Sequence, residues 1–462
     1  MRVKILFLVF CLTSAVSTGS HAAEDEDCPI PPGIRFLPTT VAPTNRLPPI
    51  LPGKDLPSDC EFYRWAWQTF LYVTDRGKVR SRFLEYSTFE DVFKLPHSPL
   101  FARSEGALLS LAPRTAQYPN KSSEPPAEIT DLEQALSEKV LIDLHGNPVW
   151  YQIHLNPTFS EFVSANDLTN LVTLKNIPTD LEFRTGSVEL KSAWTIIDGP
   201  NSDFITADAL VPVFKKDSLG KVTRDGTKTR QVKVALISLH VVGVIDGHPE
   251  FIWATFEHTS RAKNKDGLRI RDVAPSADAS GQKVINDGIA YHLYPGTTKG
   301  SVAPLPGAND GAKLADLALN PSTQKFSPVS AIYRIFPFSV QKAAAEEDPA
   351  IVSLNRDVQK AFDGLQGDVR RNYSLVAAVW LNKPRNDFQV GASYPPDPAD
   401  KFQGFGGEDG LSNMAIESFT QPDAPNCFSC HDTNSDRKSG LMASRLSVSH
   451  VLSKYFKAAL KK

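Results

Sequence analysis

The sequence is poor in sulfur-containing residues and lacks the common signatures of nucleotide and hydrolase chemistry. Its 462 residues include only three methionines and five cysteines. No G-x-G-x-x-G, Walker loop, G-x-S-x-G elbow or H-E-x-x-H motif occurs, and no pair of carboxylates can be singled out as catalytic. These absences argue against a dinucleotide-binding protein, a P-loop enzyme, an α/β-type serine hydrolase and a zinc protease.

A strong charge bias and a long apolar run are also missing. The formal net charge is −2, and no apolar run of about 18 residues follows residue 22. We therefore expect no nucleic-acid partner, no attraction to an anionic membrane surface and no transmembrane segment in the mature chain. With 41% hydrophobic and 22% charged residues, the chain has the composition of a globular protein that can bury a sizeable core.

Residues 1–22 have the three parts of a secretory signal peptide. Basic Arg2 and Lys4 precede the apolar run 5–12, and a small-x-small cleavage site ends at Ala22. We therefore expect an exported mature protein, either periplasmic or secreted.

The cysteines that are present include a C-x-x-C-H motif at 427–431. Over one helical turn, Cys427, Cys430 and His431 occupy positions i, i+3 and i+4, so they project to one side. The two thiols can form thioethers with the vinyl groups of a porphyrin, and the imidazole can then bind the iron. The spacing predicts one covalent haem c with His431 as the proximal ligand. A redox-active C-x-x-C pair is the alternative, but a Gly/Asp/Pro-rich stretch precedes the motif where a βαβ context would be needed.

Two further cysteines remain in the mature chain, Cys28 and Cys60, because Cys11 falls in the expected signal peptide. In an oxidising compartment we expect a disulfide between them. It would pin a proline-rich arm, 23–60, which has too many prolines for a helix or a central strand. Two buried thiols are the alternative.

Hydrophobic patterning predicts an α+β protein in which strands dominate the middle of the chain. Strands are expected at 139–155 (two strands around a turn at 145–148), 187–197, 204–214, 232–244, 250–258, 289–294, 331–338 and 373–381. Helices are expected at 59–75, 349–365 and 411–419, and from about residue 447 to the end. Residues 105–130, 260–285 and 295–325 are rich in turn-forming residues and are expected to be loops.

These elements suggest four segments. They are the signal peptide 1–22, the arm 23–60 that a disulfide would pin, a β-rich domain 61–405 and a helical haem c-binding segment 406–462. The few residues after His431 cannot enclose a haem alone, so the β-rich domain must supply much of the pocket. We therefore expect a large β-rich domain with peripheral helices and a short helical C-terminal segment that packs on it and binds haem c.

The clearest element is the segment 232–258, where Asp246 and Gly247 form a two-residue hairpin signal between apolar runs. In this register the side chains separate into two sets, one on each face of the hairpin. One face would carry Ile237, Leu239, Val241, Ile252, Ala254, Phe256 and His258, and the other Ser238, His240, Trp253, Thr255 and Glu257. The first face is wholly apolar apart from its terminal histidine.

Few side chains could supply a sixth ligand to the iron. Met442, shortly after His431, could fold back over the haem, and a His/Met pair would suit electron transfer. His258 is the main long-range candidate, either as a ligand or as a distal acid or base. Met414 and His450 are further candidates, although core packing explains a methionine in a helix more simply. An iron open to solvent is the remaining alternative.

The assembled segments resemble a family of exported monohaem cytochrome c-like proteins of uncharacterised activity, with a large N-terminal domain and a single C-terminal C-x-x-C-H. The resemblance covers most of the mature chain. It runs through "FYRWAWQTFLYVT", "LIDLHGNPVWYQIHLN", "VELKSAWTII", "HVVGVIDGHPEFIWATFEH", "NYSLVAAVWLN" and "LSNMAIESFTQPDAPNCFSCH". After the T-F-E-H match the family continues with an acidic residue and Asn, where this chain has Thr259 and Ser260. The resemblance implies a c-type haem protein and brings no established substrate.

We therefore expect an exported monohaem c-type cytochrome that transfers single electrons with a redox partner protein or a small-molecule donor or acceptor. An open iron would instead permit peroxide or oxygen chemistry, with Glu257, His258 and Arg261 as distal groups. A third alternative is a non-catalytic protein that is stabilised by haem and serves in binding or sensing.

Overall fold

The structure is a computed structural model. It describes residues 27–30, 42–46, 57–76, 81–94, 109–110, 138–198, 203–263, 269–271, 273–278, 280, 282–286, 288–296, 299–335, 349–365, 367–383, 387–392, 404–407, 410–421, 427–434 and 439–460. The expected signal peptide 1–22 and most of the arm 23–60 lie outside the described residues.

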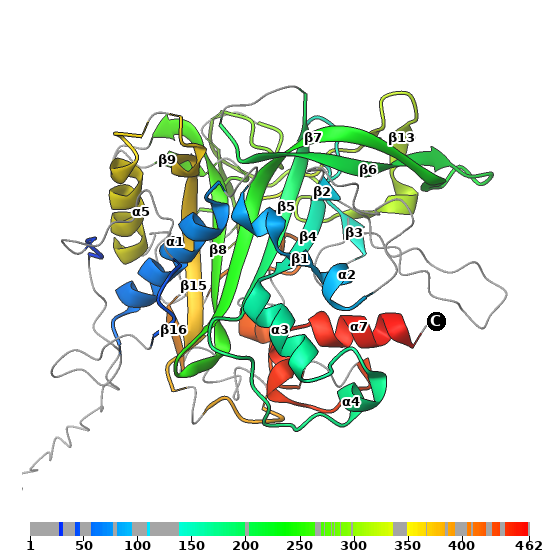
Figure 1. Cartoon of the computed structure of the whole chain (residues 1–462). Coiled ribbons are helices and arrows are strands. Elements are labelled where there is room, and N and C mark those ends of the chain that lie inside the picture. Colours follow the sequence, from blue (N-terminus) through cyan, green and yellow to red (C-terminus); the bar gives the residue numbers. More distant parts are fainter. Residues whose placement is uncertain are drawn as a thin grey trace, which may run out of the picture.

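A ten-stranded sheet forms the centre of the described part of the chain (Figure 1). Its main path is antiparallel throughout. In spatial order the path contains β1 (Ser87–Thr88), β4 (Trp150–Leu155), β5 (Val188–Ile197), β7 (Val222–Ile245), β8 (His248–Lys263), β15 (Tyr373–Leu381) and β16 (Phe405–Gly407). Three strands pair beside it: β6 (Thr206–Lys216) with β7, β2 (Leu109–Ser110) with β6, and β9 (Arg269–Arg271) with β8. A large antiparallel sheet with a few helices confirms the expected α+β class.

The helices are short and peripheral. They are α1 (Asp59–Thr74), α2 (Phe89–Val92), α3 (Pro157–Ala165), α4 (Leu171–Lys175), α5 (Pro349–Ala361) and α7 (Val451–Ala459), together with the 3₁₀ turns η1 (Arg82–Glu85), η3 (Leu314–Asp316), η4 (Val369–Asn372), η6 (Cys427–Ser429) and η8 (Arg445–Val448). Among the described residues, no helix is both long enough and apolar enough to cross a membrane.

Small two-stranded sheets lie outside the main sheet. They pair β3 (Lys139–Val140) with β12 (Ala312–Lys313), β10 (Val284–Asn286) with β11 (Gly300–Val302), and β13 (Ala318–Asn320) with β14 (Lys325–Ser327). Several of these strands fall in regions expected to be loops. The predictions of strands at 289–294 and 331–338 are wrong for the described residues there, which form only the isolated bridges of Tyr291 with Tyr294 and of Arg334 with Ser276.

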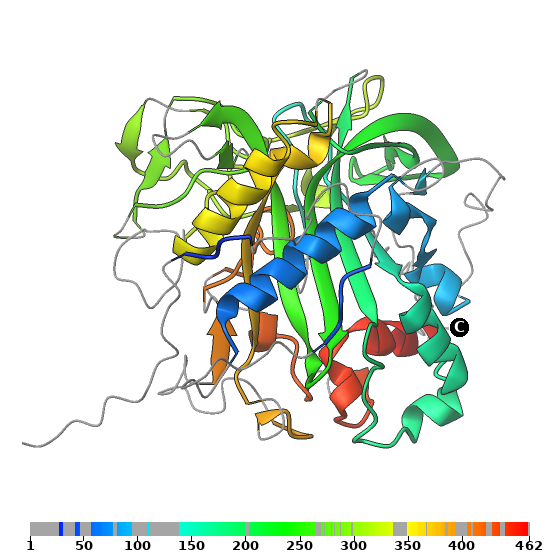
Figure 2. The same ribbon diagram turned by 60° about the vertical axis from the view of Figure 1, so that its left-hand side comes forward.

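Helix α1 crosses one face of the sheet (Figure 2). It begins where the Ser58 hydroxyl accepts a hydrogen bond from the Cys60 amide at 3.3 Å. Its aromatic stripe packs on β8: the ring of Phe70 stacks on Phe256 at 4.3 Å, and Trp67 meets the same ring edge-on at 5.0 Å. This contact supplies much of the apolar core on that face.

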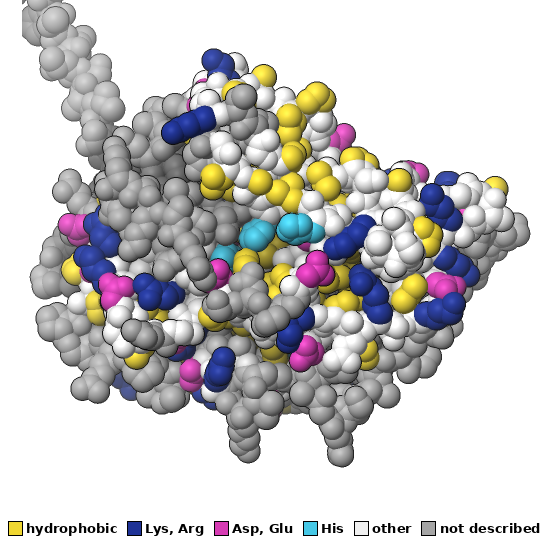
Figure 3. All heavy atoms as spheres, turned by 90° about the horizontal axis from the view of Figure 1, so that it is seen from above, with side chains coloured by type: hydrophobic (Ala, Val, Ile, Leu, Met, Phe, Trp, Pro, Cys, Tyr) yellow, Lys and Arg dark blue, Asp and Glu magenta, His cyan; other side chains and the backbone are white. Residues whose placement is uncertain are grey.

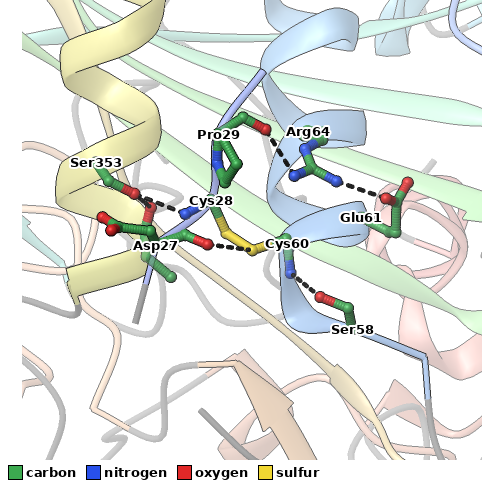
Figure 4. Close-up of a disulfide and its surroundings, with 9 residues drawn as sticks. Asp27, Cys28, Pro29, Ser58, Cys60, Glu61, Arg64 and Ser353 are labelled. Carbon is green, nitrogen blue, oxygen red and sulfur yellow. Dashed lines mark hydrogen bonds and ion pairs between the residues drawn. A yellow bond between two sulfur atoms is a disulfide. The ribbon is translucent and has the colours of Figure 1, made fainter. Parts of the chain in front are cut away.

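The disulfide between Cys28 and Cys60 is present, as expected (Figure 4). Their Cα atoms are 5.4 Å apart, and both residues are buried. The Cys28 amide donates to Ser353 Oγ of α5 at 2.7 Å, while Cys60 belongs to α1. The described end of the arm therefore joins the two helices that cover this face of the sheet.

The hairpin of β7 and β8 has the predicted turn, but its register shifts at a bulge between Gly243 and Ile245. The prediction that Ile237 shares the apolar face is wrong, because Ile237 packs with Met414 and Ile416 and not with Leu239 and Phe256. Ile245 pairs with His248 around Asp246 and Gly247, whose φ is +80°. Ser238 lies opposite Glu257, His240 opposite Thr255 and Val242 opposite Trp253, so these side chains share the face away from α1.

The segment at 411–419 packs on that second face, but the prediction of a helix there is wrong. It forms a series of turns. The Asn413 side chain accepts from the Ala415 amide at 2.9 Å, and Glu417 accepts from the Asn413 amide at 2.9 Å. These side chains compete with the backbone bonds of a helix. The turns are held to the sheet because Tyr151 Oη donates to the Ala415 carbonyl at 2.6 Å and Asn413 Nδ2 donates to Thr255 Oγ1 at 2.7 Å.

Candidate functional site

The C-x-x-C-H motif forms one tight turn. The amides of Cys430 and His431 both donate to the Cys427 carbonyl, at 3.2 and 2.9 Å. The three residues therefore lie on a single turn, as the i, i+3, i+4 spacing predicts. Both cysteines are thiols and are half-buried.

Phe428 anchors this turn to the sheet. Its side chain is fully buried and stacks on Phe405 of β16 with ring centroids 5.3 Å apart and planes 4° apart. It also meets Trp253 of β8 edge-on at 6.4 Å. The motif is therefore attached to the central sheet through the one residue between its cysteines that is large and apolar.

The hydrogen bond of His431 fixes its tautomer. His431 Nδ1 lies 2.8 Å from the carbonyl oxygen of Val448 in η8. A carbonyl can only accept, so Nδ1 must carry the hydrogen, and Nε2 of the neutral ring is left with a lone pair. A histidine that binds a metal through one nitrogen commonly donates its other N–H to a carbonyl or carboxylate. The side chain is therefore oriented as a proximal iron ligand needs.

Two aromatic rings lie against the imidazole of His431. The Trp253 ring is 4.2 Å away and tilted by 39°, and the His450 ring is stacked at 3.9 Å with the planes 18° apart. His450 Nε2 lies 3.0 Å from the Cys430 carbonyl, so this nitrogen must donate. The C-terminal segment thus returns to contact the motif through both a ring and a hydrogen bond.

Burial makes this site unfavourable for charge. Burial, and then the charge of His450, hold the pKa of His431 well below its usual value. Burial lowers the pKa of His450 to about 4. Burial, followed by the negative charge of Glu417, raises the pKa of the Cys427 thiol well above its usual value. At neutral pH the imidazole of His431 is therefore neutral, so it is able to bind a metal. The thiol of Cys427 is protonated.

A polar pair lies within electrostatic range of the motif. His240 Nε2 of β7 is 2.6 Å from Glu417 Oε1. Burial would raise the pKa of Glu417, but the positive charges of His240 and Lys191 outweigh it, and the pKa lies below its usual value. Lys191 and His240 also contribute to the lowered pKa of His431. A carboxylate of the turns at 411–419, paired with His240 of β7, therefore lies on the same face of the sheet as Trp253.

The structure does not bring His258 to this site. His258 Nε2 lies 3.0 Å from the Asp203 carbonyl, and the ring stacks on Phe204 at 3.8 Å. It follows Trp253 by five residues in β8, a distance of about 16 Å along an extended strand. Glu257 is also engaged elsewhere, since it forms a buried ion pair with Arg334 at 2.5 Å.

The two methionines occupy different surroundings. The Met442 side chain is 53% exposed and lies between the buried residues Leu441 and Ala443, so it would have to turn inward to meet an iron. Met414 is fully buried, and its amide donates to Glu257 Oε1 at 2.9 Å. Met414 therefore packs in the core where the turns at 411–419 meet the sheet.

Histidines also gather elsewhere on the molecule. Figure 3 shows histidine side chains close together in a hollow of the face seen from above, whereas α7 lies toward the lower end of Figure 1. In the core, the rings of His258 and His292 are 6.0 Å apart, with Phe204 against both. Among the residues that the structure describes, no group of three or more His, Cys, Asp or Glu side chains is arranged to hold a metal ion.

Sequence reasoning identified Cys427, Cys430 and His431 but gave no role in the site to Trp253 or to the His240–Glu417 pair. The hairpin signal already placed His240 and Trp253 on one face. The hairpin signal would therefore have indicated His240 and Trp253 as site residues if the C-x-x-C-H motif had been known to pack on that face. No local pattern could have indicated that the ring of His450 stacks on His431, because the contact depends on how the last helix docks.

No family model, no curated protein and no solved structure matches this chain.

Proposed function

We propose that this protein is an exported c-type cytochrome that carries one haem on Cys427 and Cys430 and transfers single electrons. The observation that supports it best is the tautomer of His431. Its Nδ1–H donates to the Val448 carbonyl at 2.8 Å, which leaves the Nε2 lone pair for an iron next to two thiols on the same turn. A bound haem c would supply a one-electron redox centre.

The surrounding residues would bind and orient such a group. Phe428 holds the turn against Phe405, and Trp253 covers the His431 ring. The Val448 carbonyl keeps the proton on Nδ1 and so makes the imidazole a better donor. In this arrangement the fold of the haem-binding segment is part of the β-rich domain rather than a separate cytochrome module.

The test is covalent haem attachment in a host with c-haem maturation machinery. We expect a haem-stained band on a denaturing gel and a pyridine haemochrome spectrum of one haem per chain. The double variant Cys427→Ala/Cys430→Ala should lose the covalent haem. The matched control is Cys28→Ser/Cys60→Ser, which removes the other cysteine pair and should keep the haem. Wild-type protein with no covalent haem would refute the proposal.

Whether a protein side chain would occupy the sixth position of the iron distinguishes the proposed electron transfer from a haem oxidoreductase. A low-spin ferric spectrum requires a second protein ligand, and a charge-transfer band lost in Met442→Ala would identify Met442 despite its exposure. His258→Ala tests the long-range candidate in the same way. The redox partner, whether a protein or a small molecule, would then be sought by its rate of electron exchange.

One observation supports a haem oxidoreductase as the second candidate. The His240–Glu417 pair is an imidazole hydrogen-bonded to a carboxylate, on the same face of the sheet as Trp253, which contacts His431, and O–O cleavage would benefit from such an acid–base group. High-spin ferric protein that binds cyanide rapidly would favour this candidate. A low-spin protein that does not bind cyanide would exclude it.

A further inference from the structure

The imidazole of His431 is held on three sides by groups from different elements. Trp253 of β8 and His450, which precedes α7, lie against the ring, and the Val448 carbonyl accepts from Nδ1. No ring contact joins Trp253 to His450 within the described part of the chain, so the two rings reach the imidazole from different directions. The Nδ1–H is occupied by the Val448 carbonyl, which leaves Nε2 as the ring nitrogen with a lone pair.

His450 is itself firmly placed. Its Nε2–H donates to the Cys430 carbonyl at 3.0 Å, and its own carbonyl accepts from the Lys454 amide of α7 at 3.0 Å. The adjacent Ser449 Oγ donates to Glu189 Oε2 of β5 at 2.7 Å. A ring held at both its side chain and its backbone can impose an orientation on the ring stacked against it.

The angle of an axial imidazole about the bond between nitrogen and iron has consequences for the metal. It decides which iron d orbital overlaps the ring, and this overlap sets the g-values of ferric low-spin haem and influences the reduction potential. The protein controls such properties through second-shell contacts. The His450 ring stacked on His431 at 3.9 Å, with the tilted Trp253 ring against it at 4.2 Å, allows the imidazole little rotation.

We propose that His450 is a positioning residue that fixes the rotation of the His431 imidazole by stacking on it, while its hydrogen bond to Cys430 ties the stack to the C-x-x-C-H turn. This inference rests on the proposed haem attachment. Because the His450 ring stacks on the His431 ring and its Nε2–H is donated to the Cys430 carbonyl, His450 would lie beside the proximal ligand and would not supply the sixth ligand. A sixth ligand would have to come from another part of the chain.

Three variants of the full-length, haem-loaded protein separate the stack from the hydrogen bond. His450→Phe keeps a flat ring and removes the donor, His450→Gln keeps a donor and removes the ring, and His450→Ala removes both. The matched control is His145→Ala, at an exposed turn histidine. The readouts are haem content after denaturation, low-temperature ferric EPR and the midpoint potential.

We expect all four variants to keep covalent haem, since both cysteines remain. His450→Ala and His450→Gln should shift and broaden the EPR g-values and shift the midpoint potential. The population of molecules with a displaced His431 ring should rise about tenfold, because the free energy of one aromatic stack corresponds to a ratio of that size. His450→Phe should retain the wild-type g-values, and His145→Ala should match wild type in every readout.

Two results would overturn the inference without touching the proposed function. The first is covalent haem with unchanged g-values and potential in His450→Gln. The second is a five-coordinate, high-spin iron in every His450 variant, which would make His450 an iron ligand. If His450→Ala does not fold, the contrast between His450→Phe and His450→Gln still decides. Absence of covalent haem in wild type would instead refute the proposed function.

Discussion

The two faces of the β7–β8 hairpin are built on different principles. On one face, Phe256 and its neighbours meet the aromatic stripe of α1, and a Cβ added to Gly243 would lie only 2.9 Å from the Trp65 ring. On the other face, Thr255 and Glu257 receive hydrogen bonds from the turns at 411–419. The first face is packed by apolar contact, whereas the second adds polar, directional contacts to an apolar cluster that includes Ile237, Met414 and Ile416.

The difference shows how one sheet can serve both stability and a site. Apolar contact is non-directional and tolerates small adjustments, so it suits a core. Buried hydrogen bonds and ion pairs lose their value if the partners move, so they suit a segment that must be placed accurately. The C-x-x-C-H turn lies on the face with the polar contacts, where Phe428 also anchors it through Phe405 and Trp253.

The largest effect should come from the apolar face. Phe70→Ala removes a ring stacked on Phe256 and should lower the free energy of unfolding by about 4 kcal/mol, because it leaves a cavity in a packed core. The haem spectrum of the folded protein should not change. Denaturant unfolding measures the first quantity and absorption the second. Val172→Ala, at an exposed position, is the control. A changed haem spectrum in folded Phe70→Ala would mean that the two faces are not independent.

A slightly smaller effect is expected from the buried ion pair on the polar face. Glu257→Gln leaves the Arg334 guanidinium without its carboxylate and should lower the free energy of unfolding by about 3 kcal/mol. Unlike Phe70→Ala, it should also disturb the haem spectrum, since Glu257 accepts from the Met414 amide. The control is Lys233→Gln, which breaks the exposed pair with Asp208 and should cost well under 1 kcal/mol. If Glu257→Gln and Lys233→Gln lowered the free energy of unfolding equally, burial would not explain the value of the ion pair.

Tyr151→Phe should be milder still. It deletes the hydroxyl that donates to the Ala415 carbonyl at 2.6 Å, and we expect a loss of about 1 kcal/mol. The effect should be local, so hydrogen exchange should quicken in 411–421 but not in α1. Uniform acceleration across the chain would show that the turns do not open independently of the core.

The smallest effect concerns pH. Burial raises the pKa of Glu250, whose backbone carbonyl accepts from Trp253 Nε1 at 3.1 Å. Because the folded-state pKa is higher than that of the unfolded chain, the native state retains a proton that the unfolded state has released. The resulting contribution to stability is therefore fully present below the unfolded pKa and is lost as pH rises through the folded pKa. In Glu250→Gln the melting temperature should depend less steeply on pH than in the wild type. An unchanged pH dependence would mean that another group causes it.

The parts of the fold that the sequence indicated are those with strong local signals. The pair Asp246 and Gly247 specified the turn, and alternation assigned Leu239 and Phe256 to one face, but no local signal indicated the bulges that shift the register and move Ile237 to the other cluster. The segment 411–419 was mistaken for a helix because its apolar spacing suits one, whereas the side chains of Asn413 and Glu417 bond to nearby amides and bend the chain.

The candidate site divides in the same way. Cys427, Cys430 and His431 are adjacent in sequence, so their spacing alone predicts their arrangement. Trp253 and His450 reach His431 only through tertiary packing, for which the sequence holds no short-range signal. The exposure of Met442 could not be foreseen either, since a methionine between apolar residues can face in either direction.

The two-residue turn at Asp246 and Gly247 also limits how the gene can vary in length. Inserting a single codon in β8 after the turn would move every later side chain of the strand to the opposite face. Glu257 would then face α1 and Phe256 would face the turns at 411–419, so one insertion would damage the core and the site together. Insertions of two codons would restore the alternation, and surviving length variants of this strand should therefore change by even numbers of residues.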